Sequence, residues 1–510
     1  MGFRKVFVVV LNIAVAVIVY ACGGGTDDSK SAAQPSGTNV PADHWIDVSM
    51  GKAGAFVMAV KSDGTVWSAG YDTYGNLGDS IQHDQDAQQY KTVPVIATFS
   101  SSSPEQHALK NVKLVAAGMD QAFALDKSNI LWAWGNNTSG LLGTNDPSSG
   151  SGIPWGGIMT PKESFLADKI NPQPASSASQ YYLNVPHKVM YDATCDGYPV
   201  DIAANEQHAM TLMNNGKVCE WGSGRDFQLH TNPRAISAPT GTGVMTEVIA
   251  IADGGLHSLM LRSDGTVWAI GKNSSYQLGD GTQTDRKKPV QVRISSAAPL
   301  INAIAITAGY THSAAVLNDN SVWEWGANGL HYATKKTSIS NVIKIDAGNG
   351  EIVALKSDGT LWHWTSGTPS QVNLSNVIDM SAGYLGCKFA ITAEGKLYGW
   401  GDNTYGQLGN GTTTSQSEPV LYNVAAAGGS TSGTGGGTGT GGSTGGGSTG
   451  GSSCNSCVND STYNNWLNKC SSSTSQAPCY CASAYLKKCC GDPSWIDDYN
   501  TAKQLGTTCW

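Results

Sequence analysis

Charged side chains are scarce in this sequence of 510 residues, and basic ones are the scarcer kind. Only 14% of the residues are Asp, Glu, Lys or Arg, and 31 basic against 39 acidic side chains leave a formal net charge of −8. Proteins that bind nucleic acid carry a concentrated basic face that neutralises phosphates. We therefore expect no nucleic-acid partner.

The motifs of common catalytic sites are also missing. The sequence has no phosphate-binding Gly-x-x-x-x-Gly-Lys-Ser/Thr loop and no His-Glu-x-x-His zinc motif, and Gly-x-Ser-x-Gly occurs only within the Gly/Ser/Thr run of 425–453. No segment assembles a nucleophile with a base. We predict a protein that is not an enzyme and that holds no cofactor and no metal.

The first 21 residues have the layout of a secretory signal peptide. Arg4 and Lys5 precede the stretch 6–19, which is apolar except for Asn12, and small residues follow at Ala21 and Cys22. This apolar run is shorter than the roughly 20 residues that a membrane-spanning helix needs. An ordinary signal peptide with an incidental cysteine stays open as the alternative to a lipoprotein signal.

Cys22 is the residue that we expect to carry a lipid, because 19–22 resembles a bacterial lipobox. Residues 22–43 are dominated by Gly, Ser, Asp, Pro and Ala, a composition typical of a flexible tether. Gly23, and not Asp, follows the cysteine, which by resemblance to lipoprotein sorting implies the outer membrane. We predict an envelope protein, periplasmic or surface-facing, that contacts the membrane through its lipid anchor.

Glycine and tryptophan, in contrast, are abundant, at 62 and 15 residues. Both recur in one pattern, which consists of a small-residue turn, an apolar stretch, a second turn and Trp-Gly or its equivalent. The seven copies are 46–70, 114–135, 202–222, 251–271, 304–326, 343–364 and 378–401. Several copies continue into a Leu-Gly turn, as at 276–281 and 405–411, and most then reach a proline that we expect to begin another strand.

Each copy predicts short strands joined by tight turns. The apolar segments 353–355 and 360–362 flank Asp358-Gly359, a strong hairpin signal because Gly tolerates a positive φ. One such unit cannot bury both of its faces, so strand-rich repeats spaced by about 35 to 90 residues indicate stacked or radial sheets. Closing the sheets into a ring protects the strand edges that an open array would expose.

The combination of small-Gly-x-x-His-Ser, Asp-Gly, Trp-Gly-x-Asn and Gly-Gln-Leu-Gly-x-Gly resembles the regulator of chromosome condensation repeat. The resemblance covers about 43–424 and implies an all-β, seven-bladed β-propeller, which we place at 44–424. The third, fifth and sixth copies lack a clean Gln-Leu-Gly turn. Because the first copy has no Pro-Val strand before it, we predict that 418–424 completes the blade begun at Trp45 and closes the ring.

The resemblance implies protein binding more than any single activity. The family's eukaryotic founder exchanges nucleotide on a small GTPase and binds chromatin, and an exported protein meets neither partner. A secreted bacterial relative inhibits β-lactamases by covering them with one face of the propeller. Fold likeness does not settle function, so a partner protein is expected but not identified.

The excursion 145–184 is a candidate binding loop, since long loops on a rigid scaffold often carry binding residues. Its aromatic side chains are the candidate contacts: Trp155, Phe165, Tyr181 and Tyr182. Packing of these rings on the rim of the propeller is the alternative.

Three histidines share one repeat position: His208, His257 and His312. We align this position with Gly54, Gln121, Glu351 and Gly386 in the other copies. Because most copies lack the histidine, we expect it to bond loop backbone within its own blade and not to form a metal ring.

Residues 425–453 are nearly pure Gly, Ser and Thr and predict a flexible linker. Beyond them, 454–510 is a cysteine-rich domain with short helices expected at 463–470 and 482–490 and a third helix beginning near 492–495. Its cysteines are Cys454, Cys457, Cys470, Cys479, Cys481, Cys489, Cys490 and Cys509. An even set in a small exported domain predicts disulfides. Zinc held by Cys454 and Cys457 is the alternative.

Trp466, Trp495 and Trp510 are candidate contacts of this domain, and a role in its small core is the alternative for the first two. In the propeller, Cys195 and Cys219 are a candidate disulfide, which leaves Cys387 buried. We predict a protein-binding propeller scaffold of the envelope. A polysaccharide-binding or adhesive protein acting through 454–510, and an enzyme using the propeller channel, are the alternatives.

Overall fold

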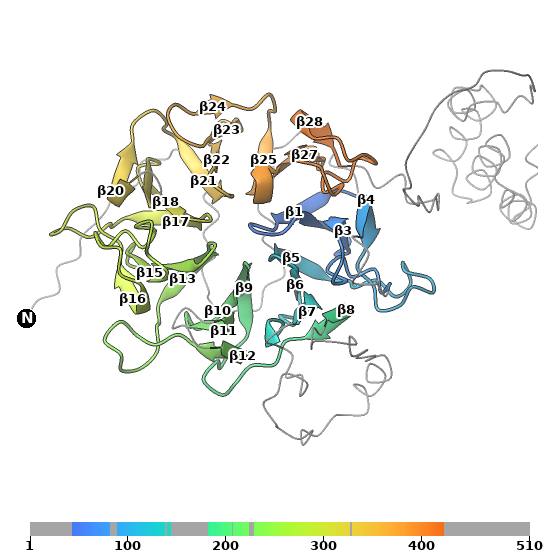
Figure 1. Cartoon of the computed structure of the whole chain (residues 1–510), viewed down its shortest axis with the longest axis horizontal. Coiled ribbons are helices and arrows are strands. Elements are labelled where there is room, and N and C mark those ends of the chain that lie inside the picture. Colours follow the sequence, from blue (N-terminus) through green and yellow to red (C-terminus); the bar gives the residue numbers. More distant parts are fainter. Residues whose placement is uncertain are drawn as a thin grey trace, which may run out of the picture. The chain divides into compact units, whose positions relative to one another are not determined.

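The computed structural model describes residues 43–81, 89–137, 140–143, 182–206, 208–223, 229–326 and 329–422. All of them belong to the first of two compact units, 1–430 and 431–510. They form seven antiparallel four-stranded sheets around a central axis (Figure 1). This architecture confirms the prediction of an all-β, seven-bladed propeller.

Each blade consists of four strands that are consecutive in the sequence, with the first strand innermost and the fourth outermost (Figure 1). Blades 1 to 3 are β1 (Trp45–Met50), β2 (Phe56–Lys61), β3 (Val66–Tyr71) and β4 (Tyr90–Ile96); β5 (Val112–Ala117), β6 (Gln121–Asp126), β7 (Leu131–Asn136) and β8 (Tyr182–Lys188); and β9 (Pro199–Ala204), β10 (His208–Met213), β11 (Val218–Ser223) and β12 (Leu229–Ala235). Blades 4 and 5 are β13 (Val248–Asp253), β14 (His257–Arg262), β15 (Val267–Gly271) and β16 (Arg286–Gln291); and β17 (Ala303–Ala308), β18 (His312–Leu317), β19 (Val322–Gly326) and β20 (Leu330–Lys336). Blades 6 and 7 are β21 (Val342–Ala347), β22 (Ile352–Lys356), β23 (Leu361–Trp364) and β24 (Ser370–Gln371); and β25 (Val377–Ala382), β26 (Lys388–Thr392), β27 (Leu397–Gly401) and β28 (Gln416–Leu421).

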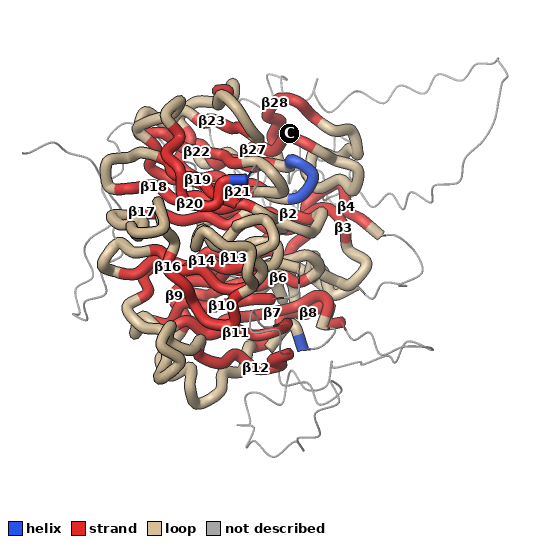
Figure 2. The backbone as a smooth tube through the Cα atoms, turned by 60° about the vertical axis from the view of Figure 1, so that its left-hand side comes forward, coloured by secondary structure: helices blue, strands red, loops and turns tan. Residues whose placement is uncertain are grey.

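Regular structure in the described part of the chain is almost entirely strand, with short 3₁₀ turns such as η4 (Tyr384–Gly386) (Figure 2). Across these same residues, no helix is long and apolar enough to cross a membrane.

The ring closes without a shared blade. Strand β28 pairs with β27, while β1 pairs with β2, so the prediction that 418–424 completes the blade of Trp45 is wrong. The joint between blades 7 and 1 consists of packing between their sheets and a few hydrogen bonds. The Trp45 amide donates to the Gly395 carbonyl (3.0 Å), and the Met50 amide donates to the Ser381 hydroxyl (3.0 Å).

A side-chain relay explains why Asp, Gly, Thr and Trp recur together at the hairpin between the second and third strands. In blade 4 the Asp264 carboxylate accepts hydrogen bonds from the Thr266 amide (3.0 Å) and hydroxyl (2.6 Å). The Thr266 hydroxyl in turn accepts from the Trp268 indole (3.0 Å). Equivalent relays are Asp63–Thr65–Trp67, Asp319–Ser321–Trp323 and Asp358–Thr360–Trp362. The acidic residues that recur in these hairpins therefore serve the fold.

The tryptophan of Trp-Gly inserts into the Leu-Gly turn of the preceding blade. Trp325 is 1% exposed, and its indole donates to the Gln277 carbonyl at 2.9 Å. Gly279 in that turn has φ +62°, and a Cβ there would lie 2.8 Å from the Trp325 ring. Trp134 and Trp221 make the same bond to the Asn76 and Leu141 carbonyls. The two sequence signatures are thus the two halves of one joint between blades.

The prolines of the repeats do not mark the entry to a strand, as we had expected, but lie inside the outermost strands. Pro94 is in β4, Pro289 in β16 and Pro419 in β28. An edge strand tolerates proline because no further strand needs its missing N–H.

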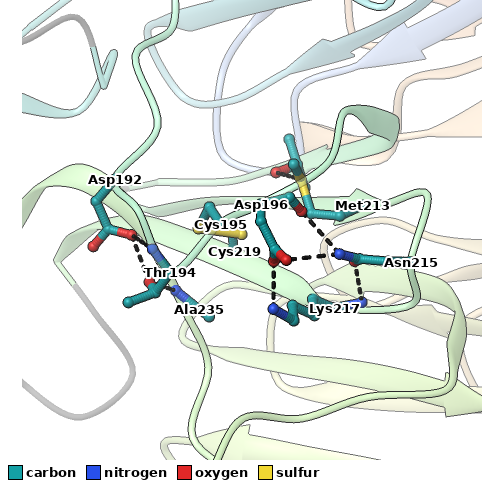
Figure 3. Close-up of a disulfide and its surroundings, with 10 residues drawn as sticks. Asp192, Thr194, Cys195, Asp196, Met213, Asn215, Lys217, Cys219 and Ala235 are labelled. Atoms are coloured by element: carbon teal, nitrogen blue, oxygen red, sulfur yellow. Dashed lines mark hydrogen bonds and ion pairs between the residues drawn. A yellow bond between two sulfur atoms is a disulfide. The ribbon is translucent and has the colours of Figure 1, made fainter.

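Cys195 and Cys219 are joined by a disulfide within blade 3, with their Cα atoms 6.0 Å apart (Figure 3). Beside it, Asp196 pairs with Lys217 and accepts a hydrogen bond from Asn215 (Figure 3). Cys387 is free and buried, and burial raises the pKa of its thiol to about 12. The eight cysteines of 454–510 lie outside the described residues.

Candidate functional site

Only one of the side chains predicted as binding contacts lies in the described part of the chain. Tyr182 begins strand β8 and pairs with Asn136 of β7, so it belongs to the outermost strand of blade 2 and not to the preceding excursion. Cys22 and the remaining candidate contacts lie outside the described residues: Trp155, Phe165, Tyr181, Trp466, Trp495 and Trp510.

The shared histidine position begins the second strand of a blade. His208, His257 and His312 pair with the glycine of their Trp-Gly or equivalent dipeptide. Phe56 pairs with the corresponding Gly70, and Cys387 immediately precedes Lys388, which pairs with Trp400. The equivalent residues are therefore Phe56 and Cys387, and the sequence alignment with Gly54 and Gly386 was wrong.

These histidines contact residues of the next blade, whereas we had expected partners within their own blade. His257 Nε2 lies 2.8 Å from the Ser313 hydroxyl of blade 5. His312 Nε2 donates to the Glu351 carbonyl of blade 6 at 3.3 Å. Burial lowers the pKa of His312 to about 4, so this ring is neutral at pH 7. The histidine at this position therefore forms a hydrogen bond between neighbouring blades.

His208 differs from the other two histidines in having a carboxylate beside each of its ring nitrogens. Its Nδ1 lies 3.0 Å from Asp253 of blade 4, and its Nε2 lies 3.1 Å from Glu220 of blade 3. The side chains of His208, Glu220 and Asp253 are 1%, 3% and 0% exposed. The nearby Ser258 hydroxyl donates to Asp253 and not to the histidine, unlike the hydroxyl of a catalytic triad. The group is an almost fully buried structural triad, and Arg234 lies 3.7 Å from the other carboxylate oxygen of Glu220.

The innermost strands surround the channel, and side chains of one blade cap the free edge of the next. Asp47 accepts a hydrogen bond from the Val115 amide (2.8 Å), and Ser49 accepts one from the Ala117 amide (3.0 Å). Asp346 in blade 6 accepts one from the Ala382 amide of blade 7 (2.9 Å). The edge of an innermost strand that faces the channel has no neighbouring strand, so these caps satisfy N–H donors that no strand pairs.

Lys52 spans the channel at the end where the first strand turns into the second. Its Nζ donates to Asp346 of blade 6 (2.8 Å) and to the Ala308 carbonyl of blade 5 (3.0 Å). Because Lys52 itself belongs to blade 1, this side chain ties together blades on opposite sides of the ring. That end of the channel carries a paired positive charge.

The other end of the channel is acidic. The third residues of four innermost strands are Asp47, Asp201, Asp379 and Lys344, of which Lys344 and Asp379 form an ion pair. Burial, together with the charge of Asp379, raises the pKa of Asp47 to about 7. Burial also raises the pKa of Asp201 to about 6. Three carboxylates therefore face one ammonium group.

Asp47→Asn is expected to stabilise the protein at high pH. The folded-state pKa of about 7 lies above the ordinary 3.8, so ionisation of Asp47 costs stability as the pH rises from about 4 through 7. The amide oxygen of Asn keeps the acceptor for the Val115 amide. Because Asp47 is only partly shielded from solvent, we expect a gain of about 1 kcal/mol at pH 8 and none at pH 4. Urea unfolding at both pH values measures it.

The hairpin residue Asp264 is the matched control for this experiment. Its bonds to Thr266 lower its pKa, so Asp264→Asn loses stability as the pH rises, the opposite sign. An Asp47→Asn gain of equal size at pH 4 and pH 8 would contradict the assignment.

A separate cavity of about 440 Å³ lies between blades 6 and 7, next to the two-residue strand β24. Its lining includes Asn376, Tyr398 and one charged side chain, Glu394, which pairs with Lys396. Throughout the described residues, no group of three or more His, Cys, Asp or Glu is arranged to hold a metal.

The repeats match known families over part of their length. The description "Regulator of chromosome condensation (RCC1) repeat" matches residues 264–316 and 394–431, and a second form of it matches 248–277. The E3 ubiquitin-protein ligase HERC2 of Homo sapiens is 30% identical over 259 residues, 44% of this chain and 5% of HERC2. The ultraviolet-B receptor UVR8 of Arabidopsis thaliana is 24% identical over 344 residues, 61% of this chain and 70% of UVR8. This chain thus spans only a small part of the ubiquitin ligase.

Solved structures share the fold at lower identity. Prp20p of Saccharomyces cerevisiae, described with its binding to Gsp1p and histones, is 18% identical with a TM-score of 0.55, covering 72% of this chain and 88% of Prp20p. Human WBSCR16 is 17% identical with a TM-score of 0.53, covering 71% and 94%. Taken with the seven blades and the matched repeats, this chain contains RCC1 repeats folded as a seven-bladed β-propeller.

Proposed function

We propose that this chain is a non-enzymatic, protein-binding propeller scaffold of the cell envelope. The observation that carries the proposal is how the repeated polar side chains are used. The Asp–Thr–Trp relays, the histidines and the inner-edge caps bond within and between blades, as Asp264, His208 and Asp47 illustrate. Since these repeated side chains stabilise the fold, we assign function to the surface loops and faces that the rigid ring supports.

Known binding by relatives supports this proposal. Yeast Prp20p is described with Gsp1p and histones as its binding partners, and another structure holds it bound to Kap60. The envelope location and the lipid on Cys22 are parts of the same proposal, supported by the composition of residues 1–43. An envelope protein would meet partners other than those of Prp20p.

Capture from an envelope extract tests the proposal. The bait is the soluble chain beginning at Gly23, compared with one variant lacking 145–181 and another lacking 454–510. The first deletion stops at 181 because Tyr182 belongs to strand β8. We expect a specific protein to be captured by the intact chain and by the variant without 454–510. Its loss with 145–181 would assign the contact to Trp155, Phe165 and Tyr181.

The same comparison separates the rival function. Capture of glycan only, or capture that disappears when 454–510 is removed, would contradict the proposal. It would instead favour a polysaccharide-binding or adhesive protein that acts through Trp466, Trp495 and Trp510.

A further inference from the structure

Each innermost strand carries a β-bulge at its second residue. In blade 4, Val248 pairs with Arg262 and Ala250 pairs with the adjacent Leu261, so Ile249 between them has no partner. The register shifts at the same place in all seven blades. A bulge re-aims the side chain of the extra residue and is common next to functional sites.

Five of these bulged residues are exposed isoleucines, which we call the isoleucine collar. Their exposed fractions are Ile249 55%, Ile304 45%, Ile343 43%, Ile378 55% and Ile46 36%. They come from blades 4, 5, 6, 7 and 1, which follow one another around the ring, and the innermost strands of these blades contact each other. The innermost strands that carry these five isoleucines therefore lie next to one another around the central axis (Figure 1).

The collar is separate from the core of the propeller. The fourth residues of the same strands, such as Ile251, Ile306 and Ile345, are buried and supply the packing between blades. Several exposed apolar side chains at one repeated position on neighbouring strands are a feature of interaction sites. The collar thus has the character of a binding surface.

The acidic side chains of the channel follow the collar directly. Asp47 comes after Ile46 and Asp379 after Ile378, and Asp201 occupies the corresponding place in blade 3. Lys344 is engaged by Asp379. Over the described residues, Asp47 and Asp201 make no ion pair; each carboxylate accepts a backbone amide hydrogen bond, from Val115 and Ile202. We call Asp47, Asp201 and Asp379 the acidic throat.

We infer that the collar and the throat bind a protein loop that presents a Lys or Arg side chain flanked by apolar residues. The apolar flanks would bury the exposed surface of the isoleucines, and the cation would enter the throat beside Asp47 and Asp201. This inference rests on the proposed protein-binding function and specifies its face and its partner. At the opposite end of the channel, the chain's own Lys52 already occupies the carboxylate of Asp346.

Charge favours this partner over the other occupants of an apolar surface. A second copy of this chain would place one acidic throat against another. A membrane with anionic headgroups would meet the same repulsion. Of these three occupants, only a loop with a basic side chain and apolar flanks complements both the isoleucine collar and the carboxylates.

Selection of displayed random twelve-residue peptides on the full chain from Gly23 onward tests the inference. We expect the enriched peptides to contain Lys or Arg between apolar residues. A variant with Ile249→Ser, Ile304→Ser and Ile378→Ser should bind the synthesised peptides at least about tenfold more weakly, equivalent to about 1.4 kcal/mol. Asp47→Asn with Asp201→Asn should also weaken binding about tenfold or more, by removing charge without altering the collar.

Ile294→Ser is the matched control, because Ile294 is 40% exposed and lies outside the collar. Its affinity for the peptides should equal that of the unaltered chain. Thermal melts establish that every variant is folded. Equal binding by the control and collar variants would overturn the inference but leave the proposed function standing, because the peptides would bind another face.

Two further outcomes would overturn the inference. Enrichment of peptides that lack a basic residue would show that the acidic throat does not bind a cation. Self-association of the chain that is lost in the collar variant would identify a second copy as the occupant. Failure to enrich any peptide, together with failure to capture any envelope protein, would count against both the inference and the proposed function.

Discussion

Trp325→Ala is expected to lower the free energy of unfolding by about 3 to 5 kcal/mol, the usual cost of emptying a buried aromatic site. The Trp325 ring is 1% exposed and packs in the core between blades 4 and 5. The substitution also removes the indole bond to the Gln277 carbonyl and opens a cavity beside Gly279. Urea unfolding followed by circular dichroism measures the loss.

Trp323→Ala is the matched control for this prediction, because Trp323 lies on the same strand but is only partly buried. We expect it to cost about 1 to 2 kcal/mol less than Trp325→Ala, because Trp323 is less buried and leaves a smaller void. The loss of stability for Trp325→Phe should lie between zero and that of Trp325→Ala, because Phe fills most of the cavity but cannot donate a hydrogen bond to the Gln277 carbonyl. Equal losses at positions 323 and 325 would contradict the role of Trp325 as a joint between blades.

His208→Ala is expected to destabilise the protein by about 3 to 5 kcal/mol, because it leaves two buried carboxylates without their shared partner. Asp253 and Glu220 lie on different blades, and both are almost fully shielded from water. Adding Glu220→Gln to His208→Ala should recover part of the loss, since one of the two buried carboxylates that contacted the histidine is then neutral. The recovery is partial because Arg234, 3.7 Å from Glu220, loses its ion pair. Denaturant unfolding of the single and double variants measures both effects.

His107→Ala serves as the control for the second prediction, because His107 is exposed and its ring bonds the carbonyl of nearby Ser103. Its stability should change by less than about 0.5 kcal/mol. A loss below about 1 kcal/mol for His208→Ala would mean that the triad contributes little to holding blades 3 and 4 together.

The repeats made the propeller predictable, because each copy contains its own hairpin. Asp358-Gly359 lies in the turn between β22 and β23, as its sequence indicates. Both halves of the Trp-Gly and Leu-Gly joint were also visible as separate signatures. Their pairing was not, since Trp325 and Gln277 are 48 residues apart and meet only because consecutive blades are neighbours.

The wrong predictions of the ring closure and of the histidine partners both concern contacts between blades. The closure predicted for 418–424 assumed a blade made from both ends of the chain, whereas β28 stays with β27. The partners of His208 and His257 were placed within their own blades because sequence spacing says little about the next blade.

The isoleucine collar had a sequence signal that pattern reasoning assigns to the core. Ile46, Ile304, Ile343 and Ile378 each open the apolar stretch of their repeat. Alternation along a regular strand would bury such a residue, but the bulge removes it from the ladder. A recurring Asn with positive φ just before the first strand, as at Asn302 and Asn341, was a further signal of this corner.

Hydrogen–deuterium exchange of the chain from Gly23 onward, with and without its captured partner, tests the binding face most directly. The account predicts that the partner slows exchange at the starts of the innermost strands of blades 4 to 7 and blade 1, around Ile249, Ile304, Ile343, Ile378 and Ile46. Protection confined to the outermost strands, or to 454–510, would contradict it.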